Sequence, residues 1–348
     1  MKDYIKIFEA ADAKRAKREK ENIIALQKEG LYPKKYSFPT TLQFELTGAC
    51  NLACKHCYNR SGDDDRIKNT RMTVNEWKRL AGYIVDNGGI FQCIISGGEP
   101  LLLGDGLFEI MDILHEDGTS FVVITNGMLL NEINIKKFKR YRYFWFQISI
   151  DGSSAELHDS FRGVKGCWEK TVAGAMGVTS SGIPLVVAHT VIPKSLPLLE
   201  DMVKLAYSLG AGSIMIGEVL PSGRAIYNKN IILSHEQRNY LYEQINELSI
   251  KYAGRIRIER SMNVRSSMAR YLSQPNCGGI IRPNGDFRLD CMVPFSIGNV
   301  LESSLKDIWD RSGCDAWHNP LVMDFIRSID EETQQGDILN HVSEDIRI

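Results

Sequence analysis

Short apolar runs alternate with helical patterns from residue 41 to about residue 225, and no other feature constrains the fold as strongly. Such alternation predicts a parallel sheet built from right-handed βαβ units. The expected strands are Thr41–Thr47, Gln92–Ser96, Phe121–Thr125, Trp145–Ile150, Pro184–Ile192 and Ser213–Leu220. The expected helices cover residues 73–87, 106–116, 131–140, 168–181 and 196–208. Six units are too few for a complete eightfold barrel, so we expect an α/β fold with a partial (β/α)6 barrel.

Two smaller segments are expected to flank this barrel. The expected parts are a helical lead-in over residues 1–40, the barrel over residues 41–228 and a small α+β extension over residues 229–348. Within the extension, Asn284-Gly285 favours a two-residue type I′ turn, which predicts a β-hairpin over Ile280–Leu289.

Charge and composition exclude several classes of function. A net charge of −1 argues against nucleic acid as a partner, because phosphate binding needs a basic face. No apolar run reaches the roughly 18 residues of a membrane span. The charged N-terminus lacks the apolar core of a signal peptide, so we expect a cytoplasmic protein that contacts no membrane. In that reducing compartment the eight cysteines are better explained as metal ligands or reactive thiols than as disulfides.

Three cysteines follow the first expected strand within eight residues, at Cys50, Cys54 and Cys57. Three thiolates on one loop can hold three irons of a 4Fe–4S cluster and leave the fourth iron open. A structural zinc site would need four ligands, and paired Cys-x2-Cys knuckles are missing from this sequence. His56 lies between two of the cysteines and could serve as a fourth ligand only with difficulty. Three unligated thiols at this density are improbable, so we favour the cluster.

Polar and glycine-rich residues follow most of the other expected strands. They are Gly97-Gly98-Glu99-Pro100 after the second strand, Asn126-Gly127 after the third, Asp151-Gly152 after the fourth and Pro221–Arg224 after the sixth. Parallel sheets and βα-barrels place their active sites at the C-terminal ends of the strands. These motifs are therefore expected to converge with the cysteine loop at one mouth.

The cysteine triplet together with Gly-Gly-Glu-Pro resembles the radical S-adenosylmethionine (SAM) superfamily, from about residue 41 to residue 310. The resemblance implies a TIM-like partial barrel whose open iron binds the amino and carboxylate groups of SAM. It also implies that an electron from an external flavodoxin-like or ferredoxin-like donor cleaves SAM. The resulting 5′-deoxyadenosyl radical abstracts a substrate hydrogen, so the cofactor supplies the difficult chemistry.

The resemblance also assigns residues to the SAM site. Gly97 and Gly98 let backbone approach a ligand closely, and Glu99 could accept hydrogen bonds from the SAM ammonium group. Arg162 lies in the segment His158–Gly166, which resembles the SPASM/Twitch subgroup, and is a candidate partner of the SAM carboxylate. The other cofactor candidates are Pro100, Thr125, Asn126, Ser149, Asp151, His189 and Glu218. The alternatives are strand-end caps, a surface arginine and buried, satisfied polar groups.

A second set of cysteines lies in the extension, at Cys277, Cys291 and Cys314. The expected hairpin places Cys277 almost opposite Cys291, and Cys314 could be a third ligand. The surrounding pattern resembles the SPASM/Twitch auxiliary-cluster extension, although a full SPASM domain has seven cysteines and a Twitch domain usually four. Either one auxiliary cluster has an unusual or open fourth ligand, or the site has decayed. We favour one auxiliary cluster.

Two cysteines remain outside both sets. Cys93 is expected to be a small buried hydrophobic residue in a strand. Cys167 stands at a helix start, where the helix N-terminus would ease thiolate formation. A radical enzyme that returns a hydrogen atom to its product needs a thiol, so Cys167 is a candidate hydrogen donor. The alternative is a residue without a chemical role.

These patterns together predict a radical SAM enzyme of oxidoreductase or isomerase type. Residues 149–170 and 218–225 resemble members that modify ribosomally made peptides by cross-linking, thioether formation or epimerisation. The lead-in is too short for a leader-peptide recognition domain, so a peptide would need a separate recognition protein or direct docking. The alternatives are a dehydrogenase or epimerase of an aminosugar or another small metabolite, and a non-catalytic iron–sulfur electron carrier.

Overall fold

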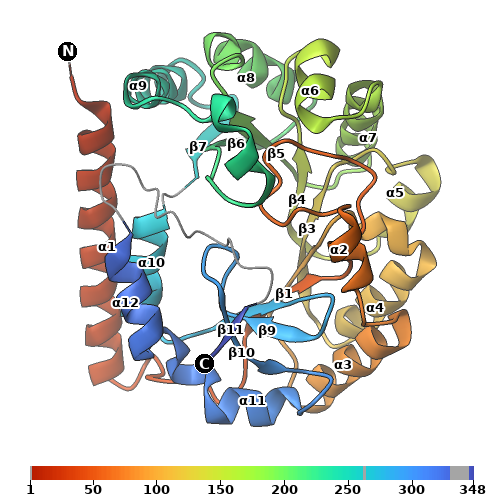
Figure 1. Cartoon of the computed structure of the whole chain (residues 1–348), viewed down its shortest axis with the longest axis vertical. Helices are drawn as coiled ribbons and strands as arrows, with labels where there is room; N and C mark the ends of the chain where they lie inside the picture. Colours follow the sequence, from red (N-terminus) through yellow and green to blue (C-terminus); the bar gives the residue numbers. More distant parts are fainter. Residues whose placement is uncertain (1, 262–263, 330–344) are drawn as a thin grey trace.

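The strands form one continuous sheet that curves into a partial barrel (Figure 1). The computed structural model describes residues 2–261, 264–329 and 345–348. Within them the strand order is β11-β10-β9-β8-β1-β2-β3-β4-β5-β6-β7. All neighbouring strands from β1 to β7 pair in parallel, and helices cover the outer side of the curve. The expected α/β partial barrel is confirmed.

The barrel elements lie close to their expected positions. The strands are β1 (Thr41–Glu45), β2 (Gln92–Ser96), β3 (Ser120–Thr125), β4 (Tyr143–Ser149), β5 (Leu185–Val191), β6 (Ser213–Glu218) and β7 (Arg257–Arg260). The helices are α2 (Asp64–Lys68), α3 (Val74–Asp86), α4 (Asp105–Glu116), α5 (Glu132–Phe138), α6 (Ala155–Arg162), α7 (Cys167–Ser180) and α8 (Leu199–Ser208). The agreement follows from the long apolar periodicity of these segments, which determines the element type reliably.

Helix α3 illustrates how the sequence builds this shell. Thr73 and Glu76 form a reciprocal capping box, which satisfies free N–H groups at the start of the helix. Trp77 and Ile84 lie on its apolar face and are fully buried. The Trp77 ring packs on Phe44 of β1 with 4.9 Å between the ring centroids. Burial of such a side chain contributes roughly 2–3 kcal/mol, which holds the helix on the sheet.

The expected lead-in helix is present as α1 (Tyr4–Lys28), which stands alongside the open side of the barrel (Figure 1). It ends at Lys28, well before Pro39. The side chain of Asn239 in α9 (His235–Lys251) accepts from the backbone N–H of Tyr4 at 2.7 Å. No helix in the described part of the chain has an apolar stretch that could span a bilayer.

The sheet continues on both sides of the six expected barrel strands, across the expected boundary at residue 228. β7 pairs with β6, and β8 (Gly278–Ile281) pairs in parallel with β1. The remaining elements are α10 (Val264–Ser273), β9 (Asp286–Arg288), β10 (Phe295–Asn299), α11 (Leu305–Arg311), α12 (Pro320–Ser328) and β11 (Ile346–Arg347). The extension is therefore joined to the barrel through shared strands.

The expected hairpin forms between β8 and β9, but its turn is not type I′. Ile281 pairs with Phe287, and the N–H of Gly285 donates to the carbonyl of Arg282. Gly285 has φ of +90°, whereas Asn284 is not among the residues with positive φ. Pro283 presets the second position of an ordinary type I turn, and the glycine follows it in the left-handed region.

Candidate active site

A cavity of about 410 Å³ lies at the mouth of the barrel. The sequence candidates that line it are Cys50, Cys54, Cys57, Gly97, Gly98, Thr125, Asn126, Ser149, Arg162, Glu218 and Cys291. They come from the cysteine loop, from the ends of the four strands β2, β3, β4 and β6 or the loops that follow them, from α6 and from the extension. The remaining candidates do not line this cavity: Glu99, Pro100, Asp151, Cys167, His189, Cys277 and Cys314.

Each sulfur of the cysteine triplet receives one hydrogen-bond donor. Ser61 N donates to Cys57 Sγ at 3.4 Å, and Arg162 Nη1 donates to Cys54 Sγ at 3.5 Å. The third contact, from the side-chain amide of Asn126 to Cys50 Sγ, is long at 4.0 Å. Donors to sulfur stabilise thiolate charge and tune the potential of an iron–sulfur cluster. The donor set therefore fits such a cluster.

Without a bound metal, burial disfavours the thiolate form of Cys50 and Cys54. It raises the pKa of Cys50 to about 12 and also raises the pKa of Cys54. Metal ligation is the interaction that deprotonates such thiols. Among the described residues no three His, Cys, Asp or Glu side chains surround the position of a single metal ion. The triplet instead borders a shared cavity, as the ligands of a larger cluster would.

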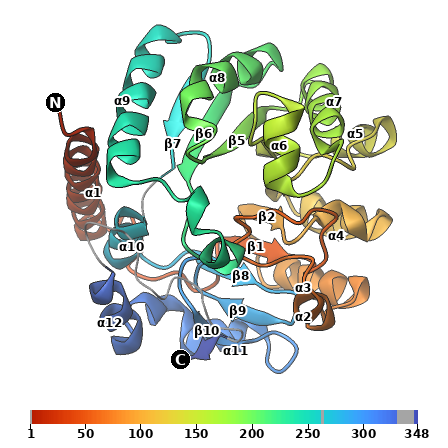
Figure 2. The same ribbon diagram turned by 45° about the horizontal axis from the view of Figure 1, so that its top comes forward.

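The segment after β6 lies next to the cysteine loop (Figure 2), and its Arg224 holds that loop in place. Its Nε donates to Cys54 O at 3.0 Å, its backbone N donates to Cys57 O at 3.0 Å, and its Nη2 donates to Ser61 O at 2.7 Å. Its Nη1 also forms an ion pair with Asp63 at 2.7 Å. The sequence places this arginine in the strand-end motif Pro221–Arg224, but local patterns carry no signal for its contacts with the loop.

Gly97 and Gly98 are required by contacts within the protein. A Cβ atom on Gly98 would lie 1.9 Å from Ala49 O, and one on Gly97 would lie 2.8 Å from Thr47 O. These distances are too short for any side chain. The two glycines therefore allow the β2 turn to pack against the cysteine loop, while their backbone also faces the cavity, as a bound SAM would require.

Glu99 does not point its carboxylate into the cavity, contrary to the expected role. Its side chain is fully buried and accepts from Leu101 N at 3.1 Å, Thr125 Oγ1 at 2.8 Å and Asn126 N at 2.9 Å. Burial raises the pKa of Glu99 to about 7, although these three hydrogen bonds oppose the rise. Since the three donors are fixed parts of the fold, Glu99 holds the end of β3 and acts on a ligand through Thr125 and Asn126, which both line the cavity. Pro100 starts the next 3₁₀ turn and is buried.

Arg162 is not a surface residue, because it is buried at the edge of the cavity and its guanidinium is already paired within the protein. Its Nη2 forms an ion pair with Asp151 Oδ2 at 2.6 Å, and both side chains are buried. Burial alone would raise the pKa of Asp151, but Arg162 and then His56 and His189 hold it below its usual value. Asp151 therefore acts as the counter-charge of Arg162, which in turn contacts Cys54.

Two further polar candidates already have partners. His189 is buried behind Asp151, and its Nδ1 lies 3.1 Å from the carbonyl oxygen of Ile150. Glu218 borders the cavity but pairs with Arg238 Nε at 2.6 Å and accepts from Tyr242 OH at 2.6 Å. Both contacts tie β6 to α9. His189 is therefore buried with only its Nδ1 hydrogen-bonded, while Glu218 is both paired with α9 and in contact with the cavity.

Cys167 does not occupy the position that a hydrogen donor needs. The residue is fully buried, and its thiol donates to Asp159 Oδ1 at 3.1 Å. Burial, and after it the neighbouring Asp159, raise the pKa of Cys167 to about 12, so the helix N-terminus does not yield a thiolate. Because the thiol does not face the cavity, the expected role as a hydrogen donor is not supported. Cys93 is buried in β2, as expected.

The three cysteines of the extension, Cys277, Cys291 and Cys314, have different surroundings. Cys277 is exposed before β8, whereas Cys291 borders the mouth cavity and Cys314 is half-buried. Asn276 Nδ2 donates to Gly313 O at 2.6 Å, so the segments that carry Cys277 and Cys314 are joined. An auxiliary cluster at these residues remains a prediction.

The fold and site define a class of protein, namely a parallel partial barrel with a three-cysteine loop at its mouth. Residues 44–206 match the Radical SAM superfamily. Over this segment the chain is similar to radical SAM enzymes. The superfamily implies a 4Fe–4S cluster and SAM as cofactors.

Comparisons with individual proteins agree with this assignment. The AdoMet-dependent heme synthase of Methanosarcina barkeri (strain Fusaro / DSM 804) is 27% identical over 293 residues, which cover 79% of this chain and 83% of that protein. The PqqA peptide cyclase of Rhizobium meliloti (strain 1021) is 28% identical over 283 residues, which cover 79% of this chain and 74% of that protein. The crystal structure of Streptococcus suis SuiB bound to S-adenosylmethionine superposes with a TM-score of 0.64 at 15% sequence identity. The superposition covers 89% of this chain and 72% of SuiB.

Proposed function

We propose that the enzyme cleaves SAM reductively at the barrel mouth and modifies a ribosomally made peptide. When bound, a cluster at Cys50, Cys54 and Cys57 would supply the electron, and SAM would supply the radical that abstracts a substrate hydrogen. The observation that carries this proposal is the set of three cysteine sulfurs, each with a donor, around one cavity. The outcome, a cross-link, a thioether or an epimerised residue, makes the enzyme an oxidoreductase or an isomerase.

Individual residues contribute to this function in different ways. We assign contact with SAM to Gly97, Gly98, Asn126 and Ser149, because all four line the cavity. Four others act by positioning these groups: Glu99, Asp151, Arg162 and Arg224. The buried Asp151–Arg162 pair next to Cys54 places a fixed positive group beside one cluster ligand, which favours the thiolate form.

The peptide substrate is favoured by the PqqA peptide cyclase among the relatives. A second candidate is a small metabolite with several carboxylates, such as a tetrapyrrole, and the heme synthase relative favours it over an aminosugar. We further propose an external electron donor and a separate peptide-recognition protein as partners. An auxiliary cluster at Cys277, Cys291 and Cys314 is also proposed, because hydrogen bonding joins two of the three segments.

Anaerobic reconstitution of the cluster, followed by dithionite and SAM, tests the proposed activity. We expect 5′-deoxyadenosine from the wild type and none from a Cys50→Ala variant. No 5′-deoxyadenosine from a fully loaded wild type, with candidate substrates present, would rule out the radical chemistry. Incorporation of deuterium from heavy-water buffer into the product would then distinguish epimerisation from cross-linking.

A further inference from the structure

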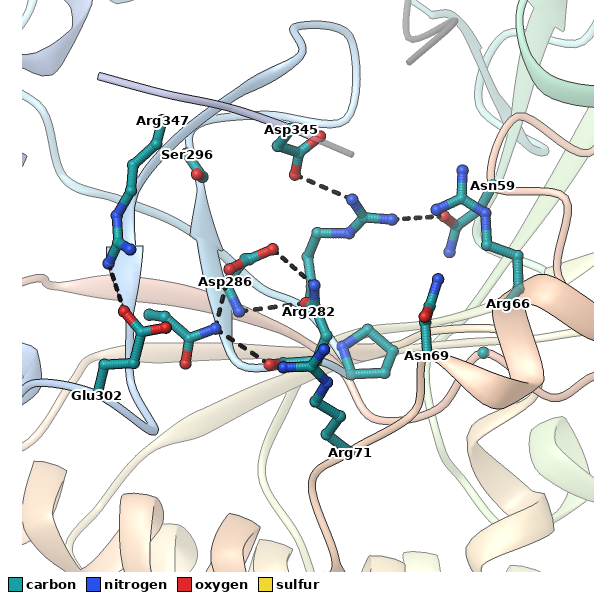
Figure 3. Close-up of a pocket in the computed structure, with 14 residues that line it drawn as sticks. Asn59, Arg66, Asn69, Arg71, Arg282, Asp286, Ser296, Glu302, Asp345 and Arg347 are labelled. Carbon is teal, nitrogen blue, oxygen red and sulfur yellow. Dashed lines mark hydrogen bonds and ion pairs between the residues drawn. The ribbon is translucent and has the colours of Figure 1, made fainter. Parts of the chain in front are cut away.

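A second cavity, of about 250 Å³, lies beside the cysteine loop and is lined by four arginines (Figure 3). Arg66 and Arg71 come from the segment after the cysteine loop, Arg282 from the β8–β9 turn and Arg347 from β11. Asn59 borders both this cavity and the mouth cavity. The two cavities are therefore neighbours that share one wall.

The carboxylates that line this second cavity already have partners. Arg282 Nη1 pairs with Asp345 at 2.9 Å, and Arg347 Nη2 pairs with Glu302 at 2.9 Å. The third carboxylate, of Asp286, accepts from the side-chain amides of Asn284 at 2.6 Å and Asn299 at 2.9 Å. The acidic groups of the lining are thus used within the fold.

Two of the arginines keep uncompensated guanidinium groups. No ion pair or hydrogen bond joins the guanidinium of Arg66 or Arg71 to any other residue in the described parts of the chain, and Arg66 Nε is buried. Burial, followed by repulsion from Arg282, lowers the pKa of Arg66, although Asp65 opposes this. Confining the partly buried charge of Arg66 without a counter-charge costs free energy, and a bound anion would remove that cost.

The same cavity already binds one carboxylate, that of Asp345. Its side chain is almost completely buried between Arg282 and Arg288, at 2.9 and 3.1 Å from their guanidinium nitrogens. A guanidinium group presents a planar fork of donors that matches a carboxylate. Asn59 and Asn69 line the same cavity as Arg66 (Figure 3), so amide groups also border it.

The shared wall connects this cavity with the reaction site. Arg282 Nη2 donates to Asn59 Oδ1 at 3.4 Å, and the side-chain amide of Asn59 contacts Glu45 at 3.5 Å. A substrate whose reacting group lies in the mouth cavity could therefore extend past Asn59 to the arginines. We infer that Arg66 and Arg71 form a subsite for a carboxylate of the substrate. This inference rests on the proposed function, and the carboxylate would be an acidic side chain of a peptide or a propionate of a tetrapyrrole.

Titration of the reconstituted enzyme with glutarate at low salt, followed by calorimetry, tests the subsite. We expect saturable binding to the wild type that weakens as salt is added. In Arg66→Gln and in Arg71→Gln, loss of a charge-assisted contact should weaken binding about tenfold or more. Lys68→Gln removes the same charge from exposed Lys68 of α2, which does not line the cavity, and should bind glutarate as the wild type does.

Equal glutarate affinity in the wild type and both arginine variants, or no saturable binding, would overturn the inference. Arg71 is exposed, so its substitution leaves the fold intact even if Arg66→Gln does not fold. Displacement of glutarate by a glutamate-containing hexapeptide would support a peptide, and displacement by coproporphyrin III would support a tetrapyrrole. Displacement by neither would refute a substrate role. Formation of 5′-deoxyadenosine reports on the proposed function separately, so each can fail alone.

Discussion

Arg224 Nε donates to the carbonyl oxygen of Cys54 at 3.0 Å, although 170 residues separate the two along the chain. This contact joins the end of β6 to the loop that carries the cluster cysteines. Close packing of Gly223 supports it, because a Cβ atom there would lie 2.3 Å from Cys57 O. The geometry of the cysteine loop therefore depends on a segment far away in sequence.

Arg224→Gln should loosen the cysteine loop. The variant loses the ion pair with Asp63 and the side-chain donors to Cys54 and Ser61, which should lower the free energy of unfolding by roughly 2 kcal/mol. We also expect lower iron content and a shifted reduction potential, measured after identical reconstitution. Arg79→Gln, at a largely exposed arginine of α3, is the control. Iron content and stability equal to those of the control would show that Arg224 does not hold the loop.

Gly98→Ala should prevent assembly of the cluster. The new methyl group would lie 1.9 Å from Ala49 O, so the cysteine loop must move. Gly82→Ala is the matched control, because no heavy atom lies within 4 Å of its added Cβ and alanine favours a helix interior by roughly 0.5–1 kcal/mol. Absorbance of the reconstituted cluster should be lost in the first variant and kept in the second. Normal absorbance from Gly98→Ala would contradict the packing argument.

Glu99→Gln should change how stability depends on pH. Burial raises the folded pKa of Glu99 to about 7 from an ordinary value near 4.5, so the folded state holds a proton that the unfolded state releases. The contribution of Glu99 to the free energy of unfolding therefore falls as pH rises from about 4.5 to about 7, and it stays constant at higher pH. The buried histidines with lowered pKa values, such as His56 and His158, act in the opposite direction.

The difference between wild type and Glu99→Gln isolates the Glu99 effect, because the histidines are common to both. Urea titrations from pH 4.5 to 8 should give a difference that shrinks as pH rises. At pH 5 the variant should be less stable by roughly 1–3 kcal/mol, because its amide would face the Asn126 N–H donor. A difference that is constant with pH would show that Glu99 has an ordinary pKa.

Replacing Cys50, Cys54 and Cys57 together by alanine tests the auxiliary cluster. If three cysteines of the extension hold a second cluster, about four irons should remain after reconstitution. A further Cys291→Ala substitution should then remove them. Iron analysis that finds none in the triple variant would leave the mouth cluster as the single metal centre of the enzyme.

Cys167→Ala should retain the radical reaction. Since the thiol is buried and bonded to Asp159, its removal leaves a small cavity and costs stability without removing a group that faces the substrate. Rates of 5′-deoxyadenosine formation and product yield should stay close to those of the wild type. Loss of product with SAM cleavage retained would restore Cys167 as the hydrogen donor.

The sequence by itself determined the βα alternation, the cysteine triplet and the meeting of the strand-end motifs at one mouth. These features follow from local periodicity and from the rule that parallel strands end at one edge. Even the β8–β9 turn was locally encoded, since Pro283 favours the turn that forms.

Only the tertiary structure decided which way each polar side chain points. Glu99 turns to Asn126, Arg162 pairs with Asp151, and Arg224 reaches the cysteine loop. These contacts join segments that are distant in sequence, and burial makes each of them obligatory because an unpaired charge would be costly. For the same reason Arg66 could not be recognised as an uncompensated cation until its neighbours were known.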